Sequence, residues 1–196
     1  MSEPAKESDL QLVQSAKAGK RDAFGKLAKK YQNKVFYLAF DLVGDYEDAK
    51  DIAQEAFIRA YEKLSQFEER AQFSTWLYRI TVNLAMDLHR RRKRRPHEPL
   101  EGNIREIERQ KKDEQEEEGR RSEMQLQTTA QRQQLEIALQ KLSKHQRVAT
   151  VLKYFHQKSS KEIAEVLGCS ENTARIHLFR ALRNMKKHLH GWQGSL

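Results

Sequence analysis

Residues 159–187 (SSKEIAEVLGCSENTARIHLFRALRNMKK) constrain the fold of this chain more than any other stretch. Ser159 can cap a helix, with Glu162 three residues later as its capping-box partner. Gly168 ends this short apolar helix where a left-handed residue is needed, and Ser170 offers the N-cap of a second, basic helix. Two helices joined by such a short glycine-containing turn predict a helix-turn-helix.

The second helix of this motif has two distinct faces. The apolar residues recur every three or four positions and should be buried: Ala174, Leu178, Ala181, Leu182 and Met185. The residues predicted to face DNA are Ser170, Asn172, Thr173, Arg175, Ile176, Phe179 and Arg180. Apolar side chains between arginines are costly in water, but in a major groove they contact thymine methyls while Arg binds guanine or phosphate. The alternative is an ordinary three-helix packing motif with a basic outer face.

The composition predicts an all-α protein. The 196 residues include only three prolines and eight glycines, Lys, Glu, Gln, Leu and Ala are abundant, and no run alternates as a strand would. The single cysteine, Cys169, excludes an internal disulfide and a multi-cysteine zinc site, so no metal or cofactor is expected. No apolar stretch approaches 18 residues, which predicts a soluble, cytoplasmic protein without membrane insertion.

The net charge of +9 is unevenly distributed along the chain. Residues 1–95 carry +5, residues 96–129 carry −4, and residues 130–196 carry +8. The acidic stretch contains few apolar residues, so it is predicted to be a flexible linker between two small helical domains, residues 8–95 and 130–190. Two basic blocks on either side of an acidic linker indicate a polyanion bound at two places.

An acidic helix is predicted in the first domain, beginning near Asp45. Residues 41–69 contain nine acidic and three basic residues, and this surface should repel DNA. A solvated helix face would explain it, but in a basic protein an acidic stripe favours a basic protein partner. The opposite side of the helix carries a regular apolar set, which should be buried: Ala49, Ile52, Ala53, Ala56, Phe57, Ala60, Tyr61 and Leu64.

The next predicted helix begins at Ser74, after a loop with aromatic residues at both ends. Phe67 and Phe73 flank Arg70 in this loop. One face of the helix carries Trp76, Arg79, Asn83 and Arg90, and six consecutive cations, Arg90 and Arg91 among them, precede Pro96. The cations could simply be a solvated helix end. Beside an aromatic loop, they favour a phosphate clamp next to a base-stacking site.

Three segments together resemble bacterial RNA polymerase sigma factors of the extracytoplasmic-function (ECF) type. AKDIAQEAFIRAYEKL resembles region 2.2, FSTWLYRITVNLAMDLHRRRKR resembles the regions that open and read the −10 element, and LSKHQRVATVLKYFHQKSSKEIAEVLGCSENTARIHLFRAL resembles region 4. The segments occur in the expected order and cover both predicted domains. Two features depart from the common pattern of this family: Ala174, where a β-branched residue is usual, and the loop sequence FEERAQ.

The resemblance implies a role for each candidate residue. The docking surface for the clamp helices of the polymerase large subunit would comprise Asp48, Asp51, Gln54, Glu55 and Phe57. The loop from Phe67 to Phe73, with Asn83, would hold a flipped-out base of the −10 element, and Arg175, Ile176 and Phe179 would read the −35 element. The partners implied are core RNA polymerase (clamp helices and flap) and promoter DNA, with an anti-sigma factor as a further candidate.

Two other classes of protein are compatible with parts of the sequence. A helical regulator that binds DNA without polymerase would share the helix-turn-helix and the basic charge, but would not need the acidic face of 41–69. An enzyme acting on nucleic acid would need clustered carboxylates or metal ligands. Glu55 and Glu62 form only a surface pair, and His145 and His156 have no partner at ligand spacing, so the sequence predicts a protein that is not an enzyme.

Overall fold

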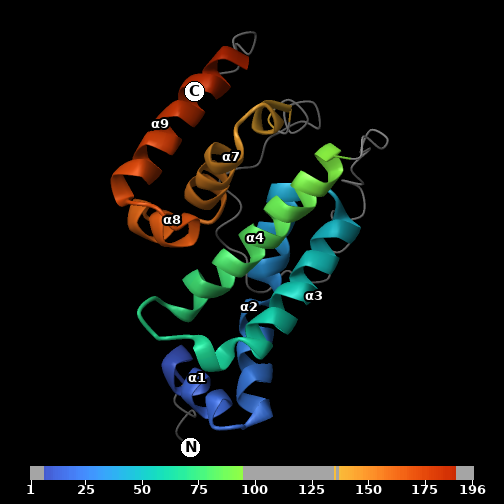
Figure 1. Cartoon of the computed structure of the whole chain (residues 1–196), viewed down its shortest axis with the longest axis vertical. Coiled ribbons are helices and arrows are strands. Elements are labelled where there is room, and N and C mark those ends of the chain that lie inside the picture. The colour runs from blue at the N-terminus through green and yellow to red at the C-terminus, as the bar shows by residue number, and fades with distance from the viewer. Residues whose placement is uncertain (1–6, 95–134, 136, 189–196) are drawn as a thin grey trace, which may run out of the picture.

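The computed structural model describes residues 7–94, 135 and 137–188, and within them the chain is helical with no strand (Figure 1). The N-terminal unit contains α1 (Asp9–Lys17), α2 (Arg21–Val43), α3 (Tyr46–Glu62), the 3-10 turn η1 (Leu64–Gln66) and α4 (Phe73–Arg94). The C-terminal unit contains α7 (Lys144–Thr150), the π-helical turn η3 (Val151–Phe155), α8 (Ser160–Leu167) and α9 (Glu171–His188). The all-α prediction is confirmed. The predicted linker, 96–129, lies outside the described residues.

Local signals in the sequence account for the positions of the helix ends. Ser8 and Ser159 both form capping boxes, and the Asp45 side chain accepts from the backbone N–H of Asp48 at the start of α3 (2.9 Å). Gly44 and Gly168 adopt left-handed conformations at the ends of α2 and α8, with φ of 76° and 66°. None of the described helices combines the length and apolar character that crossing a membrane requires.

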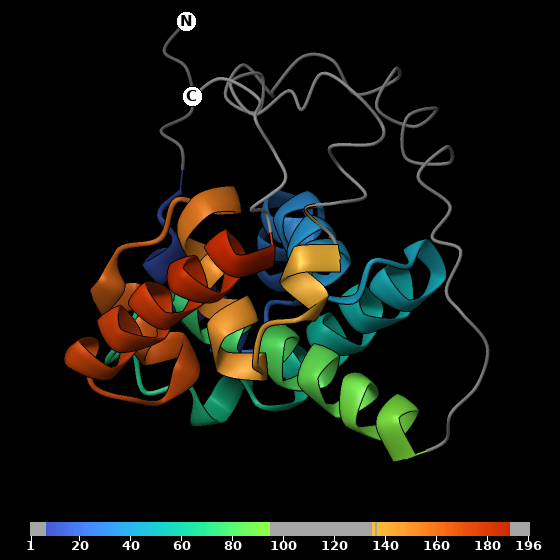
Figure 2. The same ribbon diagram turned by 90° about the horizontal axis from the view of Figure 1, so that it is seen from above.

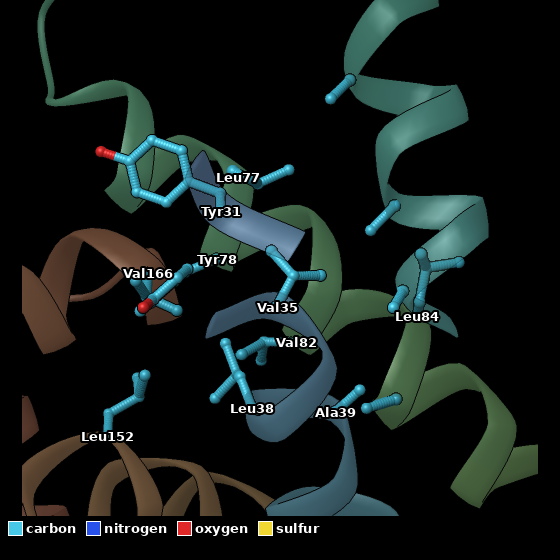
Figure 3. Packing of buried hydrophobic residues seen from close by; sticks show 14 of the residues in the cluster. Tyr31, Val35, Leu38, Ala39, Leu77, Tyr78, Val82, Leu84, Leu152 and Val166 are labelled. Atoms are coloured by element: carbon cyan, nitrogen blue, oxygen red, sulfur yellow. The ribbon is translucent and has the colours of Figure 1, made fainter. Parts of the chain in front are cut away.

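The N-terminal unit is organised around α2, which packs against α1, α3 and α4. The residues that hold these helices together are fully buried: Leu27, Val35, Leu38, Leu77 and Val82. Figure 3 shows several of them converging from α2 and α4. Since α3 and α4 each turn one face towards this core, their other faces remain available to partners.

The C-terminal unit packs directly onto the N-terminal unit, which the sequence did not predict. Helix α8 contacts α4, and η3 contacts α2. Leu152 and Val166 join the same apolar core as Leu38 and Tyr78, and Figure 3 shows these four side chains close together. In Figures 1 and 2, α8 lies between α4 and α9.

Polar contacts also cross this junction between the two units. Arg147 donates to the carbonyl of Leu42 (3.0 Å), and Nε2 of His156 lies 2.9 Å from a carboxylate oxygen of Asp41. The His156 side chain is only 5% exposed, and its ring meets Tyr78 edge-on. We call this set of contacts the interdomain contact; it closes the two units onto each other.

Candidate nucleic-acid and protein-binding surfaces

Helix α9 is held in place by its cap and by two small residues. The Ser170 hydroxyl accepts from the backbone N–H of Thr173 (3.1 Å) and lies 2.8 Å from its hydroxyl. Ala174 and Ala181 are fully buried where α9 packs against α8 and α7. Ser170 and Thr173, predicted to face DNA, are therefore first of all the cap that fixes the start of the helix.

The outer face of α9 carries the predicted combination of apolar and basic side chains. Phe179 is 68% exposed, and Ile176 is also exposed between arginines. The exposed polar residues on this face are Asn172, Arg175, Arg180 and Arg183. Arg175 forms an exposed ion pair with Glu171 (2.5 Å), a contact of little stability that can be exchanged for DNA. Leu182, predicted to be buried, is exposed, because it lies at the edge of the apolar row.

A histidine pair beneath this face was missed by sequence reasoning. The rings of His145, on α7, and His177, on α9, stack with their centroids 5.3 Å apart. Burial, the neighbouring His145 and the nearby Arg180 lower the pKa of His177 below its usual value. His177 therefore adds little positive charge to this face at neutral pH, and its exposed arginines supply most of the charge.

The exposed face of α3 is acidic with an apolar centre. Its exposed residues recur with helical spacing, and the three carboxylates among them outnumber the single cation, Lys50: Glu47, Lys50, Asp51, Gln54, Ile58, Tyr61 and Glu62. Glu55 is half-buried and pairs with Arg59 (2.7 Å), and Phe57 is half-buried at the other edge. Tyr61 was predicted to be buried but is about half exposed, with its ring meeting Phe24 edge-on. Ile58 was missed, although two exposed apolar residues among carboxylates are typical of a protein interface.

Asp48 differs from the other predicted docking residues. It forms an ion pair with Arg92, so that α3 is linked to the cationic end of α4. Burial raises the pKa of Asp48 above its usual value, and Asp45 and Asp51 add to this effect against the opposing influence of Arg92. Asp48 is therefore mainly a bridge between helices, and the exposed carboxylate at Asp51 is better placed to meet a partner.

One face of α4 presents the polar residues predicted for nucleic acid. Asn83, Arg79, Arg90 and Arg91 are exposed, and Trp76 is half-buried. Arg90 pairs with Asp87 on the same helix. Since the spacing of three or four residues puts these side chains in one row, α4 can follow a nucleic-acid strand along its length.

The loop before α4 corrects one part of the sequence interpretation. Phe67 is 5% exposed and Phe73 is 3% exposed, so neither ring is free to stack on a base in this structure. Both rings pack against Trp76, with centroids 4.9 and 5.8 Å away, and close the apolar core beneath the loop. The tip between them is exposed, and Arg70 there pairs with Glu68 (2.9 Å). Phe67 and Phe73 therefore form the buried floor of the loop. The surface above this floor is made by the exposed tip of the loop and by Trp76.

Comparisons with known proteins agree with this division into two units. Residues 27–95 match the family model described as Sigma-70 region 2, and residues 132–185 match Sigma-70, region 4. The RNA polymerase sigma-H factor of Pseudomonas aeruginosa is 34% identical over 187 residues, covering 93% of this chain and 94% of the relative. The ECF RNA polymerase sigma factor SigW of Bacillus subtilis is 33% identical over 183 residues, covering 90% and 94%.

Solved structures show the same fold. CnrH, in complex with the cytosolic domain of CnrY, aligns with a TM-score of 0.69 at 23% identity, covering 94% of this chain and 99% of CnrH. The sigma factor RpoE of Bartonella quintana, in complex with the anti-sigma factor NepR, aligns with a TM-score of 0.59 at 20% identity, covering 85% and 96%.

The two helical units, with an acidic helical face on one and a helix-turn-helix on the other, define a DNA-binding transcription initiation factor rather than an enzyme. The chain belongs to the sigma-70 family of RNA polymerase sigma factors, and within it to the ECF type. As a sigma factor, it directs promoter-specific initiation by RNA polymerase.

Proposed function

We propose that this sigma factor divides its work among three surfaces: α3 binds core polymerase, α4 with its preceding loop binds the −10 element, and α9 reads the −35 element. The main support for this proposal is that acidic and basic side chains lie on different helices. The exposed face of α3 is acidic, whereas those of α4 and α9 are basic. An acidic surface repels DNA and attracts a basic protein, so the three faces select different partners.

For α3, the contact surface centres on Ile58 and Tyr61 and is ringed by acidic and amide groups. Exposed apolar residues supply the energy of a protein interface, and the surrounding charges supply its specificity and rate of formation. Asp51, Gln54 and Glu55 lie on or beside this face and are proposed to meet the clamp helices of the polymerase large subunit. Phe57 supports the edge of the same surface. The C-terminal unit is proposed to bind the polymerase flap.

For α9, the exposed arginines and the two apolar side chains between them fit a major groove. Arg175 and Arg180 can bind guanine or phosphate, while Ile176 and Phe179 can contact thymine methyls. Asn172 lies at the start of the helix, where helix-turn-helix proteins place base contacts. The buried alanines let α9 pack closely against α7 and α8, so that its outer face is presented as a rigid unit.

For α4, Asn83 is proposed to bind a base of the −10 element that has left the stack. Unstacking a base costs a few kcal/mol, which hydrogen bonds and stacking on the protein must offset. Trp76, which packs on Phe67 and Phe73 beneath the loop, is half-buried, and Arg79, Arg90 and Arg91 continue the row towards phosphates. The tip of the loop, with Arg70, borders the same region.

The interdomain contact must open before both promoter elements can be bound. Helix α8 lies within 8 Å of α4 between Cα atoms, and α9 packs against α8. Since only α8 separates α9 from α4 and packed helices lie about 8–10 Å apart, the axes of α9 and α4 lie roughly 20 Å apart where both pack on α8. Promoter elements about 17 base pairs apart are separated by roughly 58 Å. The closed arrangement is therefore too short to bind both.

The length of the segment between the units permits this opening. Residues 96–129 could span up to about 110–120 Å if fully extended, roughly twice the distance between the two promoter elements. The closed arrangement is proposed for the free protein, and binding to polymerase is proposed to separate the units. The protein is proposed to act in the cytoplasm. An anti-sigma factor that binds both units there would preserve the closed state. A stress or envelope response is the proposed setting.

The test combines a polymerase pull-down with run-off transcription from a promoter library, using purified core polymerase and the full chain. Retention on core polymerase together with transcription from selected templates is expected. A protein that binds the same DNA but is not retained by core polymerase would instead be a regulator that acts on DNA alone.

A further inference from the structure

We propose that Lys17 is a positioning residue that sets the conformation of the −10 loop, residues 67–73, and thereby the base this loop accepts. Lys17 is the last residue of α1 and lies 50 positions from the loop in sequence. Its ammonium group donates to the backbone carbonyl of Phe67 (2.5 Å) and pairs with the carboxylate of Glu69 (3.0 Å). It also lies 5.5 Å from the centre of the Phe67 ring.

These three contacts hold the loop on both sides of its first turn. The Phe67 ring is buried and fixes where the loop leaves the core, while the bond to its carbonyl fixes the direction of the backbone. Glu69, two residues later, has a positive φ of 60°, a conformation that few residues other than glycine adopt. Tertiary contacts must maintain such a conformation, and the ion pair with Lys17 is a contact of this kind.

The position of Lys17 favours an indirect role over a DNA contact. Its side chain is only 26% exposed, and its charge is compensated by Glu69. The exposed tip of the loop, from Glu68 to Gln72, lies beyond this anchor. Loss of the anchor should therefore leave the loop present but imprecisely placed, which affects discrimination between bases more than affinity for phosphate.

The proposal rests on the proposed function, in which this loop reads the −10 element, and the experiment separates the two. The template library is randomised over the −10 element, and one round of transcription with the parent protein selects active templates from it. Each full-length variant, with core polymerase, then transcribes this selected library. Four variants are compared with the parent: Lys17→Met, Lys17→Arg, Lys26→Met and Arg70→Ala. Lys26 is the matched control, because its ammonium group forms an exposed ion pair with Glu7, at the N-terminal side of α1, instead of with the loop. Arg70→Ala reports whether the tip of the loop reads DNA at all.

Lys17→Met is expected to lower the preference for the favoured −10 base by about tenfold, the effect of losing one charge-assisted hydrogen bond. Lys17→Arg should recover part of this preference, and Lys26→Met should match the parent. Core-polymerase affinity, −35 binding and the circular dichroism spectrum should be unchanged in all four. If Arg70→Ala alters base preference while Lys17→Met does not, Lys17 does not position the loop. If neither alters it, the loop does not read the −10 element and the proposed function of the loop is wrong.

Discussion

Replacing Asp41 with alanine should open the interdomain contact without unfolding either unit. Asp41 lies on α2, and its carboxylate meets the imidazole of His156, 115 residues later, at 2.9 Å. Since the His156 side chain is 5% exposed, the substitution leaves a buried ring nitrogen without this partner. A hydrogen bond to a charged group contributes about 1.5–3 kcal/mol, so the ratio of open to closed protein should rise roughly 10- to 150-fold.

Energy transfer between dyes on the two units measures this ratio. The dyes are attached through Gln32→Cys on α2 and Lys186→Cys on α9, both exposed positions, in a Cys169→Ser background. Asp41→Ala should lower the transfer efficiency relative to the parent protein. Adding core polymerase to the parent protein should lower the efficiency below that of free Asp41→Ala. Asp22→Ala is the matched control, because Asp22 is an exposed residue near the other end of α2 and should leave the transfer unchanged.

The same variant should bind core polymerase more tightly if opening precedes binding, because a larger fraction of the protein is then competent. Equal transfer in the parent protein and Asp41→Ala would show that the His156 contact does not hold the units together. Low transfer in the parent itself would show that the closed arrangement is not the free state.

Three further predictions concern the polymerase-binding face, the two DNA-binding faces and the N-terminal cap of α8. Asp51→Lys combined with Glu55→Lys should abolish core-polymerase binding with an unchanged circular dichroism spectrum, whereas Asp22→Lys should not; normal affinity of the double variant would remove α3 from the interface. Asn83→Ala should lower promoter opening, measured with permanganate, more than duplex binding, whereas Arg175→Ala should weaken −35 binding in gel shifts by about 1–3 kcal/mol; equal effects on both assays would contradict the division of labour. Partial burial disfavours ionisation of Glu162, but hydrogen bonds from Lys158 and Ser159 outweigh it and lower its pKa to about 2. The ionised form therefore stabilises the fold above the ordinary value of 4.5 and loses this effect as the pH falls towards 2. A loss of about 1 kcal/mol in Glu162→Gln should lower Tm by roughly 2–4 °C near neutral pH and by less in acid. A Tm difference that does not depend on pH would contradict this assignment.

Local features of the fold could be predicted from the sequence because their causes are local. The capping box of Ser159 and Glu162 and the left-handed Gly168 are encoded within a few residues. The exposure of Ile176 and Phe179 could be predicted from helical periodicity, because the buried positions recur every three or four residues and leave the opposite face to solvent. The acidic face of α3 was predictable for the same reason.

The contacts that the sequence did not reveal join distant segments. Asp41 and His156 are ordinary surface-type residues in isolation, and only the packing of α8 on α4 brings their helices together. The loop before α4 shows the same difficulty, because aromatic residues at its ends fit a base-stacking site and a buried floor equally well. Burial of Phe67 decides between them, and Lys17 enters only because α1 ends beside that loop.

Sequencing the transcripts from a promoter library, made with core polymerase and the full-length parent protein, tests the central claim most directly. If α4 and α9 read separate elements in an opened chain, the selected templates should share two enriched blocks separated by a spacer that places them roughly 58 Å apart. Arg175→Ala should change only the upstream block, and Asn83→Ala only the downstream block. A single enriched block, or transcription that does not depend on the distance between the two, would contradict the account.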